Sequence, residues 1–257
     1  MIRFADIAAW RVYRDGLGTA SIGFVPTMGA LHAGHQSLVD ASLAQNDRTV
    51  VSIFVNPTQF DQAQDLAAYP QQLERDLAVL ESSGVDAVLL PDYQELYPDD
   101  FRYRVSERDL STRFCGAHRP GHFDGVLTVV MRLLNIVRPD KAYFGEKDYQ
   151  QLELVRDMVE AFFMDVEVVA CPTVREADGL ALSSRNQRLK MEQRALAPTL
   201  YRALQNSVNS SEAARALQQA GFNVEYVEDF EGRRLAAARL GEIRLIDNIA
   251  LENADAG

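Results

Sequence analysis

The segment PTMGALHAGH at residues 26–35 says the most about the fold of this 257-residue chain. It follows an apolar run at residues 22–25, which is typical of a buried strand, and it precedes the helical spacing of Leu38, Ala41 and Leu43. Its two histidines therefore lie where the carboxyl end of a strand meets the N-terminus of a helix. Backbone N–H groups are unpaired there and the helix dipole is positive, so this junction favours a bound anion.

His32 and His35 suit such an anion site, because an imidazole can donate a hydrogen bond to a phosphate oxygen. Gly29 and Gly34 leave the backbone open to close approach by a ligand. The His-x-x-His pair is not specific by itself, since it also fits a turn with two surface histidines or part of a metal site.

Short apolar runs alternate with helical patterns along the first two thirds of the chain. Apolar residues at helical spacing predict helices over residues 73–80, 123–137 and 152–162. Repeated alternation of strand and helix is typical of an α/β fold with a parallel sheet covered on both faces. The predicted strands are 22–25, 49–55, 86–90, 141–144 and 166–170.

The pattern changes after residue 175. A polar loop leads into helical patterns at 192–204 and 211–219, and two strand candidates follow at 223–227 and 243–246. We therefore expect a large α/β domain over residues 1–175 and a smaller α+β domain over residues 176–257.

Composition narrows the class of protein. A net charge of −11 without a long basic run argues against a nucleic-acid binder, and a polyanionic ligand would need local Arg, Lys and backbone groups together with a divalent cation. No apolar run approaches the ~18 to 20 residues of a membrane span, so no membrane partner is expected. With two cysteines and no signal-peptide pattern, we expect a cytoplasmic protein without disulfides.

Polar clusters follow four of the predicted strands, at residues 27–35, 56–60, 145–151 and 173–188. In an open α/β sheet the carboxyl ends of the strands lie at one edge, where ligands bind. We therefore predict a nucleotide-type site at that edge. The chain has no phosphate-binding P-loop, and the glycine pair at residues 16 and 18 lacks the third glycine of a dinucleotide fingerprint.

The residue types in these clusters indicate a chemistry. Two imidazoles, the ammonium group of Lys147 and the sequence Ser183-Ser184-Arg185 can bind the phosphates of ATP and stabilise charge that develops at the α-phosphorus. The amides of Gln59 and Gln151 suit a small hydroxylated carboxylic acid. No Ser-His-Asp arrangement can be recognised in the sequence, so a covalent enzyme intermediate is not indicated.

These segments resemble the signature blocks of the pantoate–β-alanine ligase (pantothenate synthetase) family. The run YFGEKDYQQ at residues 143–151 is the most specific of them, and RLIDN at residues 244–248 resembles the closing motif of the family. Gln71, Arg132 and Thr58 depart from the usual Arg, Lys and Met of that family. The other matching blocks are residues 26–35, 56–60, 119–123, 139–151 and 178–186.

The resemblance implies a Rossmann-like domain of the nucleotidylyltransferase and class I synthetase type, a smaller C-terminal lid domain and a homodimer. It implies that the pantoate carboxylate attacks the α-phosphorus of Mg-ATP to give pantoyl adenylate and pyrophosphate. The amine of β-alanine then attacks the acyl carbon and expels AMP, which gives pantothenate for coenzyme A biosynthesis.

The resemblance also assigns roles to residues. His35 would be a proton donor, His32 would lie beside the phosphates, and Lys147 would neutralise phosphate charge. Gln59 and Gln151 would hold pantoate, and no direct metal ligand is assigned. The implied ATP-binding residues are Met28, Gly29, Ala30, Leu31, His32, Ala33, Gly34, His35, Gly145, Glu146, Lys147, Asp148, Val174, Leu182, Ser183, Ser184 and Arg185.

Several alternatives remain open from the sequence. Cys115, His118 and His122 have metal-ligand chemistry at plausible spacing but lack an evident fourth ligand, and His122 could instead order the turn at 119–123. Asp76 is expected on a solvated helix face, with a position near magnesium as the alternative. For the whole chain, the alternatives are a nucleotidylyltransferase, which keeps the adenylate as product, and a non-enzymatic nucleotide-sensing protein.

Overall fold

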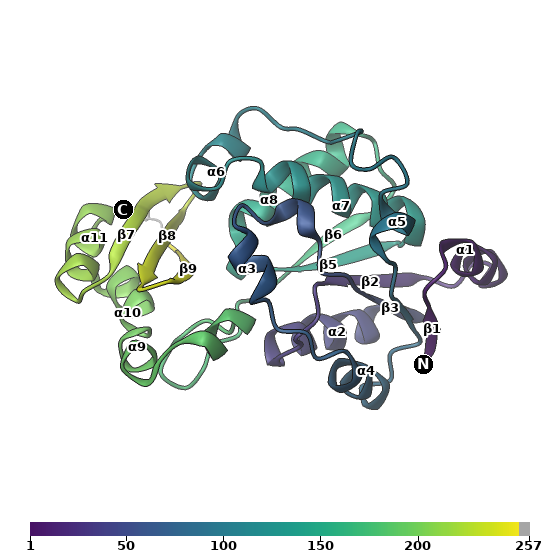
Figure 1. The fold of residues 1–257 in the computed structure, drawn as a ribbon, viewed down its shortest axis with the longest axis horizontal. Coiled ribbons are helices and arrows are strands. Elements are labelled where there is room, and N and C mark those ends of the chain that lie inside the picture. Colours follow the sequence, from purple (N-terminus) through teal and green to yellow (C-terminus); the bar gives the residue numbers. More distant parts are fainter. Residues whose placement is uncertain (252–257) are drawn as a thin grey trace, which may run out of the picture. The chain divides into compact units, whose positions relative to one another are not determined.

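The first sheet contains six strands: β1 (Ile2–Phe4), β2 (Ile22–Thr27), β3 (Arg48–Ile53), β4 (Ala87–Leu89), β5 (Lys141–Gly145) and β6 (Glu167–Cys171) (Figure 1). They pair in the order β1-β4-β3-β2-β5-β6, and every neighbouring pair is parallel. The pairing of β2 with β3 runs from Ile22 opposite Arg48 to Thr27 opposite Ile53. All six carboxyl ends therefore lie at one edge of this sheet.

This computed structural model describes residues 1–251, and the chain divides into two units. Unit 1 comprises Met1–Glu146 and Gln150–Cys171. Unit 2 comprises Lys147–Tyr149 and the chain from Pro172 onward. The three residues Lys147–Tyr149, which begin two positions after the end of β5, thus group with the C-terminal part of the chain.

Helices cover both faces of the first sheet. The helical elements between residues 7 and 161 are α1 (Ile7–Gly16), α2 (Ala33–Gln45), η1 (Pro57–Gln59), α3 (Ala63–Ala67), α4 (Leu73–Ser82), α5 (Tyr93–Leu96), η2 (Leu110–Thr112), α6 (Cys115–His118), α7 (His122–Val137), η3 (Glu146–Asp148) and α8 (Tyr149–Ala161). Helices α2 and α4 lie on one face, and α7 and α8 lie on the other (Figure 1). Because both faces are covered, β2 and β3 are buried over most of their length, which explains why apolar residues on both faces marked these strands in the sequence.

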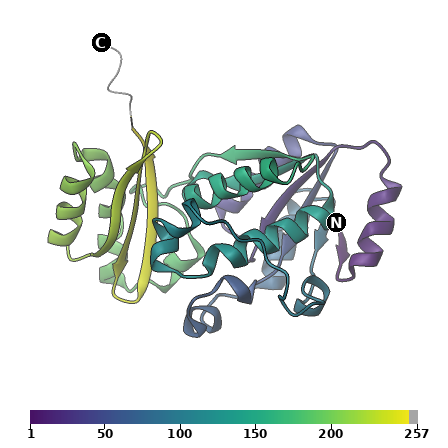
Figure 2. The same ribbon diagram turned by 90° about the horizontal axis from the view of Figure 1, so that it is seen from above.

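Unit 2 contains a three-stranded antiparallel sheet with the strands β7 (Asn223–Phe230), β8 (Arg233–Leu240) and β9 (Ile243–Ala250). Its helices are η4 (Ser184–Arg188), α9 (Met191–Leu196), α10 (Thr199–Asn206) and α11 (Ser210–Gln219), and Figure 2 shows α10 and α11 on one face of the sheet. Leu200, Leu204, Leu217, Ala238 and Leu245 belong to the core between them. None of the helices within residues 1–251 combines the length and the apolar composition that crossing a membrane requires.

The predicted fold class is confirmed, and each of the five strands predicted for the parallel sheet is present within two residues of its expected ends. One predicted helix is wrong in detail. The pattern at residues 192–204 forms two helices, α9 and α10, that are separated at Ala197-Pro198. Proline has no backbone N–H to donate to the preceding turn, so the helix ends there and a new one begins.

Candidate active site

The topology predicts that a ligand binds beside the carboxyl ends of β2 and β5. These two strands are neighbours, yet β2 is followed by α2 on one face of the sheet and β5 is followed by α8 on the other (Figure 1). The connections diverge at this point, and in open α/β sheets ligands bind outside the carboxyl ends of the strands at such a point. The predicted segments 27–35 and 145–146 both lie there in unit 1.

A buried carboxylate shapes the loop between β2 and α2. Asp76 on α4 is only 2% exposed, and its two oxygens accept the backbone N–H groups of Ala30 at 2.7 Å and Leu31 at 2.9 Å. Gly29 has φ +78° and Ala30 has φ +51°, so the loop holds two consecutive residues in the left-handed region. A Cβ at position 29 would lie only 3.0 Å from Asp76 Oδ2, so a residue larger than glycine would crowd the carboxylate.

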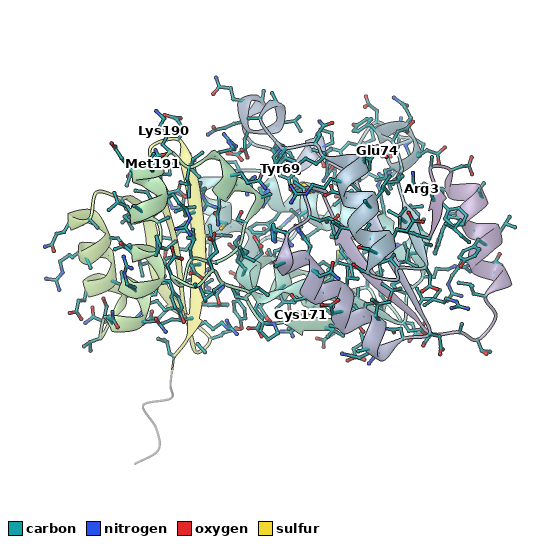
Figure 3. All side chains as sticks on the ribbon, turned by 90° about the horizontal axis from the view of Figure 1, so that it is seen from below. Arg3, Tyr69, Glu74, Cys171, Lys190 and Met191 are labelled. Carbon is teal, nitrogen blue, oxygen red and sulfur yellow. The ribbon has the colours of Figure 1, made fainter. Side chains whose placement is uncertain are left out.

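The expectation that Asp76 belongs to a solvated helix face is therefore wrong. Glu74 and Arg75 are exposed, as expected, and Glu74 is labelled on α4 in Figure 3. Asp76 points inward because its carboxylate replaces water as the partner of two loop N–H groups, a strong charge-assisted arrangement. Both oxygens of Asp76 are occupied by the protein.

The two histidines form the cap of α2. Nδ1 of His32, the N-cap residue, accepts the N–H of Gly34 at 3.1 Å, and Nδ1 of His35 accepts the N–H of His32 at 3.4 Å. The ring centroids lie 4.1 Å apart. Because Nδ1 of each ring is an acceptor, the neutral form of each histidine carries its proton on Nε2. Each ring is thus a hydrogen-bond donor through Nε2.

The segment after β3 is also held by side chains. Asn56 is buried, caps η1, and donates from Nδ2 to Oε1 of Gln59 at 2.9 Å and to the carbonyl of Gly125 at 3.2 Å. The N-terminal end of α7 approaches closely here, because a Cβ on Gly125 would lie 2.4 Å from the carbonyl oxygen of Thr58. Asn56 was not predicted individually from the sequence, although an Asn directly before a helix-starting Pro is a recognisable cap signal.

Arg119 and His122 fix the backbone of Gln59. His122 Nδ1 lies 2.7 Å from the carbonyl oxygen of Gln59, so it donates there, and Nε2 accepts from Arg119 Nη1 at 2.9 Å. Burial would raise the pKa of Asp61, but its hydrogen bond and charge interaction with Arg119 lower that pKa below its ordinary value. His122 therefore orders the turn at 119–123. Within residues 1–251, no three or more His, Cys, Asp and Glu side chains gather as a metal site.

The two adjacent glutamines of α8 have different environments. Gln150 is 4% exposed; its Oε1 accepts the N–H of Cys115, and its Nε2 donates to the carbonyls of Leu110 and Arg113. Gln151 is half-buried, and its side chain has no hydrogen-bond partner among the described residues. Gln150 thus serves the fold, and the amide of Gln151 remains available to a ligand.

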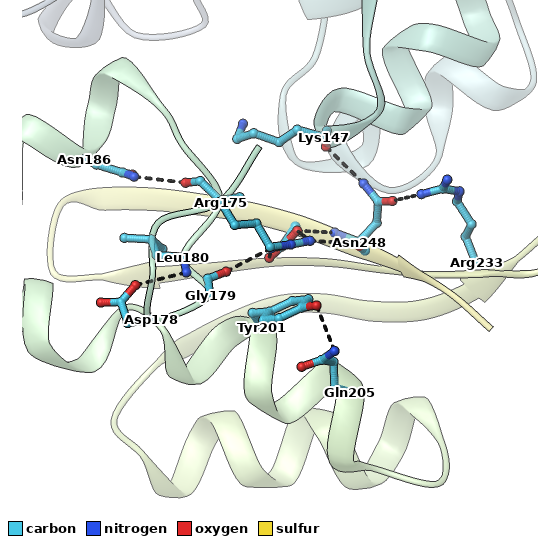
Figure 4. A network of polar contacts seen from close by, with 12 residues as sticks. Lys147, Arg175, Asp178, Gly179, Leu180, Asn186, Tyr201, Gln205, Arg233 and Asn248 are labelled. Atoms are coloured by element: carbon cyan, nitrogen blue, oxygen red, sulfur yellow. Dashed lines mark hydrogen bonds and ion pairs between the residues drawn. The ribbon is translucent and has the colours of Figure 1, made fainter. Parts of the chain in front are cut away.

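The remaining predicted residues belong to unit 2. Lys147 Nζ lies 3.5 Å from Asp148 Oδ2, and the carbonyl of Lys147 accepts from Asn248 (Figure 4). Leu182 N–H donates to the carbonyl of Val174 at 3.0 Å, and Ser183 caps η4, in which Ser184 is buried. The predicted ATP-binding set is therefore divided, with residues 28–35 and 145–146 in unit 1 and the rest in unit 2.

The Pantoate-beta-alanine ligase family model matches residues 3–250. The chain belongs to the pantoate–β-alanine ligase family. The resemblance seen in the signature blocks is thereby confirmed across almost the whole chain rather than at isolated motifs.

Individual members of the family are similar over their full length. A pantothenate synthetase of Bdellovibrio bacteriovorus is 56% identical over 247 residues, covering 96% of this chain and 97% of that protein. A Legionella pneumophila pantothenate synthetase is 49% identical, covering 96% and 99%. The crystal structure of a Francisella tularensis pantoate–β-alanine ligase, complexed with β-γ ATP and β-alanine, is 40% identical with a TM-score of 0.93 and 97% coverage of both chains.

A Thermus thermophilus pantothenate synthetase structure is 45% identical with a TM-score of 0.88, covering 97% of this chain and 99% of that one. The family therefore has the same fold as the chain described here, with a Rossmann-like parallel sheet and a small antiparallel sheet.

Proposed function

We propose that this protein is an ATP-dependent ligase that joins pantoate to β-alanine and releases AMP and pyrophosphate. The observation that carries the proposal is the family match over residues 3–250, supported by a 40% identical structure that holds β-γ ATP and β-alanine. The expected product, pantothenate, is a precursor of coenzyme A.

In the first step, a carboxylate oxygen of pantoate attacks the α-phosphorus of ATP, a new P–O bond forms, and pyrophosphate leaves. His35 and His32 are proposed to donate from Nε2 to phosphate oxygens, which the Nδ1 contacts of both rings support. Donors that are fixed before the reaction stabilise developing charge most effectively. The amides of Gln59 and Gln151 are proposed to hold pantoate.

Backbone and cationic groups are proposed to complete ATP binding. The segment 28–34 leads into the start of α2, where the helix dipole favours phosphate, and the N–H groups of Ala30, Leu31 and Gly34 already have side-chain partners. Gly145 and Glu146 end β5 and begin η3, where a nucleotide can approach the backbone. The other proposed contacts come from Lys147, Asp148, Val174, Leu182, Ser183, Ser184 and Arg185.

In the second step, the amine of β-alanine attacks the acyl carbon of pantoyl adenylate. The C–N bond forms, the bond to the AMP oxygen breaks, and the amine loses a proton. We propose that unit 2 acts as a lid that excludes water during this step, because water would otherwise hydrolyse the adenylate.

Magnesium is proposed to enter with the phosphates of ATP. Mg²⁺ in such sites usually keeps several waters and needs only one or two carboxylates beside the substrate phosphates. Both oxygens of Asp76 accept loop N–H groups, and residues 1–251 contain no gathered set of three or more metal-ligating side chains, so the ion would be held mainly by the ATP phosphates and water. When bound, the ion would neutralise phosphate charge.

We also propose that the protein works in the cytoplasm as a homodimer, with small molecules rather than nucleic acid as its ligands. The net charge of −11 supports the last point, because a nucleic-acid binder needs basic surface to release counterions.

Isotope exchange tests the order of the two steps. If pantoyl adenylate forms first, labelled pyrophosphate should enter ATP when pantoate is present and β-alanine is absent. Gln151→Ala should raise the KM for pantoate by roughly tenfold or more, because a buried polar group that loses its partner costs about 1 to 3 kcal/mol. ATP binding should be nearly unchanged.

Gln45→Ala, a change at an exposed glutamine of α2, is the control and should leave exchange unaffected. A strict requirement for β-alanine would contradict the adenylate mechanism. Release of free adenylate, without AMP when an amine is supplied, would favour the nucleotidylyltransferase alternative.

A further inference from the structure

The RLIDN motif at residues 244–248 lies on β9, and none of the proposed chemistry uses it. Two of its polar side chains are nevertheless buried, with Asp247 4% exposed and Asn248 3% exposed. Burying an amide and a carboxylate in a small antiparallel sheet is unfavourable unless each finds partners. Their partners include Arg175 and the segment that carries Lys147, both of which lie far away in the sequence.

The amide of Asn248 holds the backbone of Lys147. Nδ2 of Asn248 donates to the carbonyl oxygen of Lys147 at 3.1 Å, and Oδ1 accepts from Nη1 of Arg233 (Figure 4). A guanidinium can only donate and a carbonyl can only accept, so this pair of neighbours permits a single orientation of the amide. Arg233 also lies over the ring of Tyr149 at 4.6 Å, two residues after Lys147.

The backbone of Asn248 is itself fixed on both sides. Its N–H donates to Oδ1 of Asp247 at 2.8 Å, and its carbonyl accepts from Nη2 of Arg175 at 3.2 Å. Arg175 forms a two-point ion pair with Asp247, at 2.6 and 2.8 Å, and stacks 3.7 Å from the centroid of the Tyr201 ring. Planar pairs of this kind restrict geometry more than a single contact does.

We propose that Asn248 is a positioning residue for ATP, which sets the place from which Lys147 reaches the phosphates. This inference rests on the proposed function, because it takes Lys147 as a phosphate-binding group. A lysine side chain is long and flexible, so the point at which its backbone is anchored determines where its ammonium group can go. Small displacements of a charge-stabilising group reduce catalysis strongly.

A double-mutant cycle between Asn248 and Lys147 tests the proposal. Asn248→Asp keeps an oxygen toward Arg233, so the sheet retains that contact, but it removes the N–H donor toward Lys147. We expect Asn248→Asp to raise the Kd of MgATP by about 3- to 30-fold, which is the usual effect of losing one well-placed hydrogen bond. The KM for pantoate in pyrophosphate exchange should stay at its wild-type value.

The decisive comparison is the same change in a Lys147→Met background. If Asn248 acts through Lys147, adding Asn248→Asp to the Lys147→Met variant should change the Kd of MgATP by less than about twofold, as expected for residues that act as one unit. Equal effects in both backgrounds would overturn the proposal, because they would indicate a general structural role or direct repulsion of phosphate by the new charge.

Glu225→Gln is the matched control, since Glu225 pairs with Arg239 and Arg244 on the same sheet and has no contact with Lys147 among the described residues. If Glu225→Gln raised the Kd of MgATP as much as Asn248→Asp does, that result would also overturn the proposal. The binding measurement does not depend on turnover. A wild-type protein that binds ATP but makes no pantothenate would contradict the proposed function, and the cycle would still report the coupling.

Discussion

At the scale of single residues, the tautomer of His35 gives a sharp prediction. Asparagine can place an oxygen near the position of Nδ1, and glutamine can place an N–H near the position of Nε2. We expect His35→Asn to keep the cap of α2 and the thermal stability, but to lose roughly 10²- to 10³-fold in adenylation rate, as removal of one transition-state donor usually does. Compared with His35→Asn, the His35→Gln variant should have a higher adenylation rate and a lower thermal stability.

Pantoate-dependent pyrophosphate exchange and thermal melting measure the two effects separately. If the asparagine variant were as active as the glutamine variant, the Nε2 donor would have no role in the first step.

Residue chemistry could be predicted where it belongs to a local motif. His32 and His35 were identified because strand, turn and helix follow one another in the sequence. Asp76 was misplaced because its partners, Ala30 and Leu31, are 46 and 45 residues away. Nothing in a charged helix segment distinguishes a carboxylate that faces water from one that receives two N–H groups of a distant loop.

At the scale of elements, the strong hydrophobic patterns were predictive and the weak ones were not. The strand β8 was missed because its sequence RRLAAARL is rich in residues that favour helices, and only its position between β7 and β9 makes it a strand. The edge strand β1 has only three residues and pairs with β4 alone. Short edge strands carry too little pattern to be recognised.

An ion pair between the loop after α5 and helix α7 predicts a pH effect. The backbone N–H of Tyr103 lowers the pKa of Asp99 to about 2, burial opposes that shift, and Arg132 on α7 adds to it. A lowered pKa in the folded state stabilises the protein above the ordinary value near 3.8, and this contribution is lost as the pH falls from about 4 toward 2.

Urea unfolding of the wild type and of Asp99→Asn should therefore show a gap in stability at pH 7 that narrows below pH 4. A gap that is the same at pH 7 and pH 3 would mean that Asp99 does not titrate with folding in this way.

At the scale of the whole molecule, we expect a two-fold symmetric dimer formed through the N-terminal part of the chain. Unit 1 exposes large apolar side chains, including Val12 at 76%, Phe162 at 57% and Phe163 at 96%. Exposed apolar groups of this size are often covered in an assembly. Light scattering at micromolar concentration should give twice the mass of one chain, and a monomer mass would contradict the expectation.

The assignment of Lys147–Tyr149 to unit 2 limits how members of this family can be recombined. A chimera that replaces only the chain from Pro172 onward would join a new β9 to an old Lys147 segment, so the partners of residue 248 would come from different parents. An exchange of the whole of unit 2 needs three crossovers: one before Lys147, one after Tyr149 and one at residue 172. For the same reason, substitutions at position 248 should covary with substitutions at positions 147–149 among members of the family.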